Sequence, residues 1–152
     1  MSSLVKELVD LITVFNRRGI DHAVCGGLAV AIHGVVRATV DIDLLIRSES
    51  LEAAYDAARS LGYDIRGLEI SFKEREVEIR RVSKVDDEGE ILALDLLLVT
   101  PQFENVWLSR ESIEYFGSRL SVISRDGLIE MKRIAGRPQD LADIARLENE
   151  EN

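Results

Sequence analysis

The apolar and polar positions of this chain follow two periods, one typical of helices and one typical of strands. Apolar residues recur at helical spacing near residues 4, 49, 125 and 138, which predicts amphipathic helices. Shorter segments are either continuously apolar or alternate polar with apolar residues, which predicts strands. We expect helices at 4–15, 27–33, 49–61, 101–109, 125–135 and 138–147, and strands at 21–25, 40–46, 63–65, 69–72, 77–82, 91–99, 113–116 and 120–123.

This order of elements predicts an α+β fold in a single domain over residues 1–152. The alternating strands at 69–72 and 77–82 are typical of half-exposed antiparallel pairs. We therefore expect a mixed, partly antiparallel central sheet flanked by helices, with closing helices at about 125–148.

A charged residue interrupts the most apolar strand. Residues 91–99 read Ile-Leu-Ala-Leu-Asp-Leu-Leu-Leu-Val, and a run of this kind indicates a strand buried on both faces. An ionised carboxylate at Asp95 would be strongly destabilising there without a partner. Two interpretations are open: Asp95 forms a salt bridge with an arginine, or it is a metal-binding carboxylate.

A pair of glycines precedes a second group of acids. Gly26 and Gly27 follow the apolar run 23–25 and open a short helix of small residues. Glycines at a strand-to-helix turn let a phosphate approach backbone N–H groups. Asp41 and Asp43 lie two residues apart on the next strand, so they point to the same face. Neighbouring carboxylates repel one another unless a proton or cation lies between them, and hard cations such as Mg²⁺ prefer these oxygen ligands.

The order of these motifs resembles the signature of the polymerase-β-like nucleotidyltransferase superfamily. In that signature a glycine followed by Gly or Ser precedes a helix, and an acid-apolar-acid motif follows on a strand. Here thirteen residues separate Gly26-Gly27 from Asp41-Ile42-Asp43. With His33-Gly34 and Arg37-x-Thr39 in between, the chain is similar to small bacterial nucleotidyltransferases of the abortive-infection and toxin–antitoxin type.

The end of the chain carries the same resemblance. Those small nucleotidyltransferases close with a lysine-bearing helix followed by Arg-x-x-Asp-x-x-Asp, and the matching positions here are Lys132, Arg137, Asp140 and Asp143. In that family the lysine helix lies near the nucleotide. From the residues alone, we expect Arg137 and Asp140 to form an i, i+3 surface pair worth roughly a few tenths of a kcal/mol.

The resemblance implies a reaction and a metal site. The reaction is the metal-dependent transfer of a nucleoside monophosphate from an NTP, such as ATP, to an acceptor hydroxyl, with release of pyrophosphate. Asp41 and Asp43 would hold two Mg²⁺ ions, with Mn²⁺ as an alternative. Asp95 would be the third catalytic and metal-binding carboxylate, because the family has a third acid on a neighbouring strand.

The resemblance also implies a nucleotide-binding surface. Gly26 and Gly27 would bind the β and γ phosphates through backbone N–H groups, and Lys132 would balance the charge of the triphosphate. Arg37 could contact a phosphate or neutralise the carboxylates, and both interpretations are open. Thr39 is the remaining nucleotide-binding candidate.

Composition narrows the class of protein. The chain has 152 residues, of which 46% are hydrophobic, and a net charge of −9 that disfavours non-specific binding to nucleic acid. It contains neither a signal-peptide pattern nor an apolar run long enough for a membrane span, so we expect a cytoplasmic protein without membrane partners. The single cysteine, Cys25, excludes an internal disulfide and is expected to be a buried small residue.

Two further functions remain open besides general nucleotidyl transfer. The chain could be a non-catalytic binding or regulatory partner in a toxin–antitoxin-like pair, or an antibiotic-modifying nucleotidyltransferase. The acceptor could be RNA, a protein side chain or a small molecule. A homodimer and a cognate partner protein are both compatible with the sequence.

Overall fold

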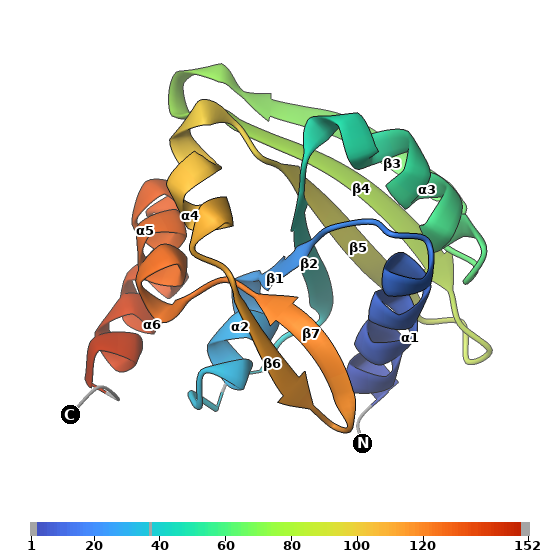
Figure 1. The fold of residues 1–152 in the computed structure, drawn as a ribbon, viewed down its shortest axis with the longest axis horizontal. Helices are drawn as coiled ribbons and strands as arrows, with labels where there is room; N and C mark the ends of the chain where they lie inside the picture. The colour runs from blue at the N-terminus through green and yellow to red at the C-terminus, as the bar shows by residue number, and fades with distance from the viewer. Residues whose placement is uncertain (1–2, 37, 150–152) are drawn as a thin grey trace.

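The computed structural model describes residues 3–36 and 38–149. These residues form helices and strands in mixed order (Figure 1). The helices are α1 (Ser3–Arg17), α2 (Gly26–Ile32), α3 (Leu51–Arg59), α4 (Glu104–Leu108), α5 (Arg125–Ala135) and α6 (Pro138–Asn149). The strands are β1 (Ala23–Cys25), β2 (Asp41–Ile46), β3 (Ile65–Phe72), β4 (Val77–Val85), β5 (Ile91–Leu98), β6 (Glu111–Tyr115) and β7 (Ser118–Val122). Short 3₁₀ turns occur at Ser48–Ser50, Lys73–Arg75 and Pro101–Phe103.

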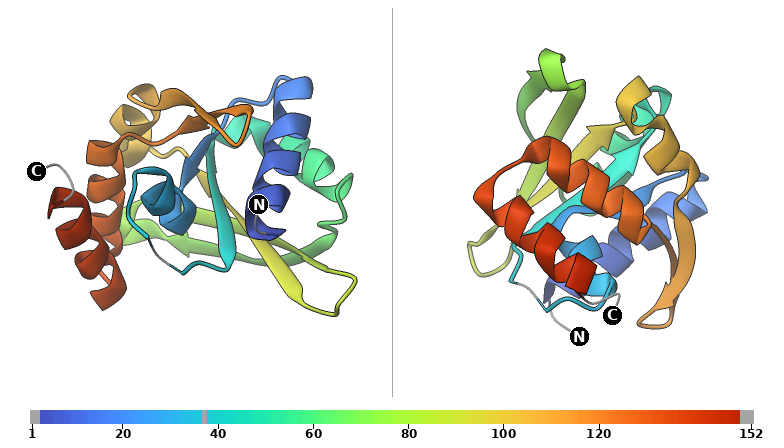
Figure 2. Two further views of the ribbon diagram at one scale, coloured as in Figure 1. Left: turned by 90° about the horizontal axis from the view of Figure 1, so that it is seen from below. Right: turned by 90° about the vertical axis from the view of Figure 1, so that its left-hand side faces the viewer.

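The described strands form one mixed sheet in the order β3-β4-β5-β2-β1-β7-β6. The pairs β2·β5 and β1·β7 are parallel, and the pairs β1·β2, β3·β4, β4·β5 and β6·β7 are antiparallel. Helices α1 and α3 pack together on one side of the sheet, whereas α5 and α6 lie on the other (Figure 2). The predicted α+β fold with a mixed, helix-flanked sheet is confirmed.

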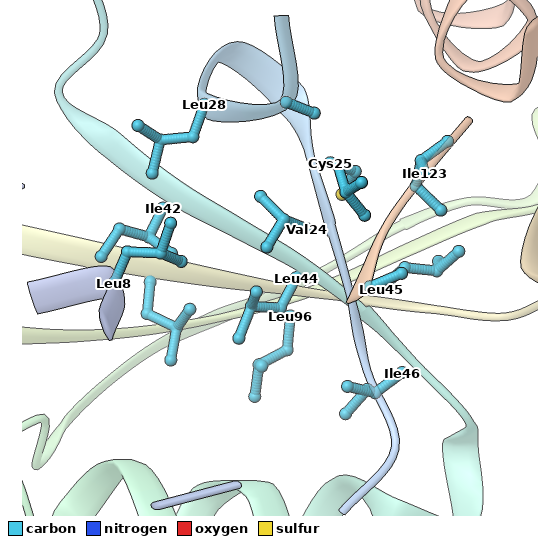
Figure 3. Close-up of a cluster of buried hydrophobic side chains, with 14 of the residues drawn as sticks. Leu8, Val24, Cys25, Leu28, Ile42, Leu44, Leu45, Ile46, Leu96 and Ile123 are labelled. Carbon is cyan, nitrogen blue, oxygen red and sulfur yellow. The ribbon is translucent and has the colours of Figure 1, made fainter. Parts of the chain in front are cut away.

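Part of the core lies between α1 and the central strands (Figure 3). Leu8 from α1 lies with Ile42 and Leu44 from β2 and with Leu96 from β5, and each of them is at most 1% exposed. The side chains of β2 alternate, so the residues between these apolar ones point to the opposite side of the sheet. Packing of one face of β2 therefore fixes where Asp41 and Asp43 point.

Several predicted elements differ in extent from those of the structure. The predicted strands 63–65 and 69–72 are one strand, β3, whose register with β4 shifts between Arg66 and Glu69. Residues on both sides of Gly67 pair with β4, so the strand continues through this glycine. Such pairing between distant segments cannot be predicted from the local sequence. The predicted helix 101–109 is divided into a 3₁₀ turn and α4, and β1 begins at Ala23 rather than at Asp21.

Candidate active site

The three acids lie side by side on two parallel strands. Asp43 on β2 pairs in register with Asp95 on β5, and Asp41 precedes Asp43 by two residues on the same face. Adjacent strands are about 5 Å apart, so carboxylates from distant parts of the sequence meet here. The register that packs Ile42 and Leu44 into the core also aligns the acids.

Gly26 makes room for these acids. Its φ of +65° lies in the left-handed region, and a Cβ at this position would collide with the Asp43 carboxylate. A side chain here would therefore be strained and would displace an acid of the site. Cys25, the N-cap of α2, makes no side-chain hydrogen bond to that end of the helix. The backbone at Gly26 and Gly27 thus borders the acids directly.

Asp43 is the most unusual acid of the group. Burial, and then the charges of Asp95 and Asp41, raise its pKa from 3.8 to about 7. Two nearby cations, Lys132 and Arg81, oppose this rise but do not cancel it. An additional positive charge nearby would therefore stabilise the ionised form of Asp43.

Arg81 on β4 occupies the far side of Asp95. Its Nε and Nη2 donate to the two Asp95 oxygens at 2.7 and 2.9 Å, and Nη2 lies 3.6 Å from Asp41 Oδ2. The hydrogen bonds to Asp95 raise the pKa of the Arg81 guanidinium further. The salt bridge to an arginine, one of the two interpretations of Asp95, is therefore present. Asp95 forms it while also lying beside Asp43 on the neighbouring strand.

Lys132 lies in a second, more deeply buried charged cluster. Its Nζ is 3.5 Å from Asp140 Oδ1 and 3.0 Å from Asp143 Oδ2. Arg137 and Asp140 do form the expected i, i+3 pair, but its expected place at the surface is wrong for Asp140, which is only 1% exposed. Asp140 accepts hydrogen bonds from the Nε, Nη2 and backbone N–H of Arg137, so it has partners on both Arg137 and Lys132.

These groups line a cavity of about 420 Å³. Its walls include Gly26, Gly27, Thr39, Asp41, Asp43, Arg81, Asp95, Lys132 and Arg137. The structure thus brings together all the site candidates except Arg37, which lies outside the described residues. Gln139 and the backbone around Thr39 complete the opposite rim.

The donor atoms at the acids suit a hard cation. They are all carboxylate oxygens, which Mg²⁺ and Mn²⁺ prefer. Burial is the main cause of the raised pKa of Asp43, and the negative charges of Asp95 and Asp41, which a cation would compensate, add to it. Within residues 3–36 and 38–149, however, no three His, Cys, Asp or Glu side chains are already arranged to hold an ion. Arg81 takes both Asp95 oxygens, so a cation at Asp41 and Asp43 would use the Asp95 lone pairs that the guanidinium leaves.

Sequence reasoning missed Arg81. It lies in a segment whose alternation predicts only a half-exposed strand, and its partner Asp95 becomes evident only from the β4·β5 register. The His33 ring, at the end of α2, donates from Nε2 to the Ile123 carbonyl at 2.7 Å. The expectation for Cys25 holds: it is buried, and burial raises the pKa of its thiol well above the usual value.

The chain is similar to solved structures of nucleotidyltransferases. The lincosamide antibiotic adenylyltransferase LnuA with bound lincomycin aligns over 94% of this chain and 95% of its own, at 17% identity and TM-score 0.61. The Thermotoga maritima protein TM1012, assigned as a nucleotidyltransferase, aligns over 97% and 93%, at 16% identity and TM-score 0.65. ANT(2")-Ia in complex with adenylyl-2"-tobramycin aligns over 96% and 87%, at 15% identity and TM-score 0.61.

These comparisons establish the fold. At such low identities the likeness shows that this chain has the nucleotidyltransferase fold, as the motifs at Gly26-Gly27 and Asp41-Ile42-Asp43 predict. No protein-family model and no curated protein sequence matches the chain. None of the helices in residues 3–36 and 38–149 is long and apolar enough to span a membrane.

Proposed function

We propose that this protein is a nucleotidyltransferase that moves a nucleoside monophosphate from an NTP to an acceptor hydroxyl. One observation carries the proposal: Asp43 pairs in register with Asp95, with Asp41 on the same face, at the wall of a cavity that also contains Gly26 and Gly27. A binding module without catalysis has no need to bring three acids together beside a turn that only glycine fits.

The backbone at Gly26 and Gly27 would bind the β and γ phosphates. Lys132 and Arg137 border the same cavity and would offset part of the triphosphate charge. The α phosphorus would then lie over Asp41 and Asp43. The described residues therefore supply positions for all parts of a triphosphate.

The chemical step is an in-line substitution at the α phosphorus. The acceptor oxygen forms a bond to this phosphorus, and the bond from phosphorus to the bridging oxygen of the β phosphate breaks. The leaving group is pyrophosphate, and the proton of the acceptor hydroxyl passes to a carboxylate oxygen of Asp95. Arg81 holds Asp95 in position for this role through its two hydrogen bonds.

Asp41 and Asp43 would hold Mg²⁺, and Asp95 would complete the site. Bound Mg²⁺ supplies charge that stabilises the attacking and leaving oxygens. The protein contributes the alignment of the three acids and the partial exclusion of water from Asp43, which is half-buried on β2.

The named relatives make ATP the first donor to test. LnuA is an adenylyltransferase and ANT(2")-Ia carries an adenylyl product, both with antibiotic acceptors. We extend adenylyl transfer to this chain, and modification of an antibiotic is one form that it could take. A regulatory, non-catalytic role is the rival, and it is favoured by Arg81, which compensates Asp95 without any metal.

The test combines binding and turnover. Calorimetry should show that Mg²⁺ and the non-hydrolysable analogue α,β-methylene-ATP bind together to the parent protein. Asp43→Asn should reduce transfer from α-labelled ATP to background while leaving the protein folded, because no described hydrogen bond depends on the Asp43 charge. A parent protein that does not bind the analogue with Mg²⁺ would support the regulatory role instead.

A further inference from the structure

A second cavity of about 370 Å³ opens from the same acids. Gly26, Asp43, Arg81, Asp95, Lys132 and Arg137 line both cavities, but the remaining walls of the second cavity are different. Apolar residues of the outer sheet, Ile70, Phe72 and Ile79, face Met131 and Ile134 of α5 across it. We call this space the apolar cleft. A molecule in it would have one end at the carboxylates.

The apolar cleft leaves large hydrophobic side chains open to solvent. Phe72 is 47% exposed and Ile70 is 38% exposed, although both could pack against further apolar groups. Its size falls within the range of about 300–1,000 Å³ that is typical of small-molecule sites. Apolar walls with a few charged groups at one end are also typical of such sites.

The strand order indicates on which side of the acids the acceptor and the leaving group would lie. Across the sheet lie first β1, which leads into Gly26 and Gly27, then β2 with Asp41 and Asp43, then β5 with Asp95, and finally β4 and β3. In-line substitution requires the acceptor to attack from the side opposite the leaving group. With the leaving phosphates at the glycines, the attacking hydroxyl lies over β5, and the rest of the acceptor extends over β4 and β3.

We propose that the apolar cleft binds the body of the acceptor, and that the acceptor is a small hydroxyl compound with an apolar face. The proposal rests on the proposed nucleotidyl transfer and specifies its substrate class. A hydroxyl at the inner end of the cleft reaches Asp95, whereas Phe72, Ile70 and Met131 contact the apolar face. A net charge of −9 disfavours a polynucleotide as the acceptor.

The nucleoside of the NTP is excluded from the cleft by the same geometry. The ribose is joined to the α phosphorus by a bond that neither forms nor breaks, so it projects away from the line between the leaving and attacking oxygens. The first cavity continues past Asp41 to Ala38, Thr39 and Val40. Binding of the nucleotide should therefore not depend on Ile70 and Phe72, which line the apolar cleft and not the first cavity.

The experiment uses matched alcohols and matched variants. The acceptor probes are 2-phenylethanol and glycerol, with α-labelled ATP and Mg²⁺, and the adenylylated alcohol is measured by mass spectrometry. The variants are Phe72→Ser and Ile70→Ser in the cleft. The control is Phe116→Ser, which replaces another half-exposed phenylalanine, 56% exposed, in the turn between β6 and β7.

We expect the parent to adenylylate 2-phenylethanol about tenfold or more faster than glycerol at equal concentration, since an apolar ring gains about that much from burial. Both cleft variants should lose most of this preference, and Phe116→Ser should keep it. Calorimetry with α,β-methylene-ATP should give the same affinity for all four proteins.

Three results would overturn the proposal. Equal use of the two alcohols by the parent, or a preference that survives in both cleft variants, would show that the cleft does not select the acceptor. Weaker binding of the ATP analogue to the cleft variants would show that the cleft holds the nucleoside. Failure of the parent to bind the analogue with Mg²⁺ would instead contradict the proposed nucleotidyl transfer itself. The binding measurement therefore distinguishes a wrong acceptor class from a wrong reaction.

Discussion

Two charged clusters border the central cavity, and they differ in how much water reaches them. In the first, Arg81 pairs with Asp95, and the side chains are 43% and 13% exposed. In the second, Lys132 lies between Asp140 and Asp143, and these three side chains are 6%, 1% and 5% exposed. The first joins two strands, whereas the second joins α5 to α6.

This difference in exposure suggests different roles for the two clusters. The more exposed Arg81–Asp95 pair is suited to exchange partners, whereas the buried Lys132 cluster is suited to stabilise the fold. A half-exposed guanidinium can move from its carboxylate at modest cost, because water replaces the lost hydrogen bonds. A buried ammonium between two buried carboxylates cannot, because each group depends on the others for compensation. We therefore expect the Arg81 pair to respond to ligands and the Lys132 cluster to govern stability.

Lys132→Met should have the largest effect on stability. The substitution leaves the Asp140 and Asp143 carboxylates buried without their ammonium partner, so the free energy of unfolding should fall by about 3–5 kcal/mol. Urea denaturation measures this loss. The control is Arg133→Met on the same helix, where Arg133 forms a 3.7 Å ion pair with Glu148 at the surface. This control should change stability by about 0.5 kcal/mol or less. Equal losses in the two variants would contradict the comparison.

Arg81→Met should have a moderate effect on stability and a larger effect on the response to Mg²⁺. It removes two charge-assisted hydrogen bonds, but Arg81 is partly exposed, so we expect a loss of about 1–2 kcal/mol. Because Asp95 then lacks a cation, added Mg²⁺ should raise the urea midpoint more in the variant than in the parent. A double-mutant cycle with Asp95→Asn isolates the pair. Identical Mg²⁺ responses would mean that the ion does not share Asp95 with Arg81.

The Lys132 cluster should also make stability depend on pH. Burial favours the neutral acid at Asp140, but hydrogen bonds from the Arg137 side chain and backbone outweigh it, and the pKa of Asp140 is lowered from 3.8. The unfolded chain therefore binds a proton more readily than the folded one. The stability from this group is present at pH values above about 4 and is lost as the pH falls through the lowered pKa. Urea midpoints of the parent and Asp140→Asn should converge below this pH, and a constant difference would contradict it.

Arg137→Met should have the smallest effect. The Arg137 side chain is 67% exposed, and Asp140 keeps Lys132 and the backbone N–H at position 137 as partners. The loss of stability should be about 1 kcal/mol or less. If Arg137 contacts the triphosphate, the affinity for α,β-methylene-ATP should fall even though the fold is intact. A loss as large as that of Lys132→Met would show that the exposed arginine also belongs to the structural cluster.

Local patterns predicted most of the elements and the order of the site motifs. The helix at Arg125–Ala135 has the predicted bounds, and Ser124 caps it through a bond from the Gly127 N–H at 3.1 Å. The alternation of β2 predicted that Asp41 and Asp43 share a face. Periodicity and capping act within a few residues, so a single segment contains the information.

Tertiary structure decided how the segments meet. The sequence marked Asp95 as anomalous but could not choose between a salt bridge and a metal site, and the structure shows Arg81 on one side of it and Asp43 on the other. Likewise, Arg137 and Asp140 have the spacing of a surface pair, but the packing of α6 on α5 buries Asp140 against Lys132. Register and burial arise from contacts between distant segments, and spacing along one segment carries no information about them. The sequence alone therefore determined which groups are present and which face of their element they occupy, whereas the tertiary structure decided which charges became partners and which stayed open to solvent.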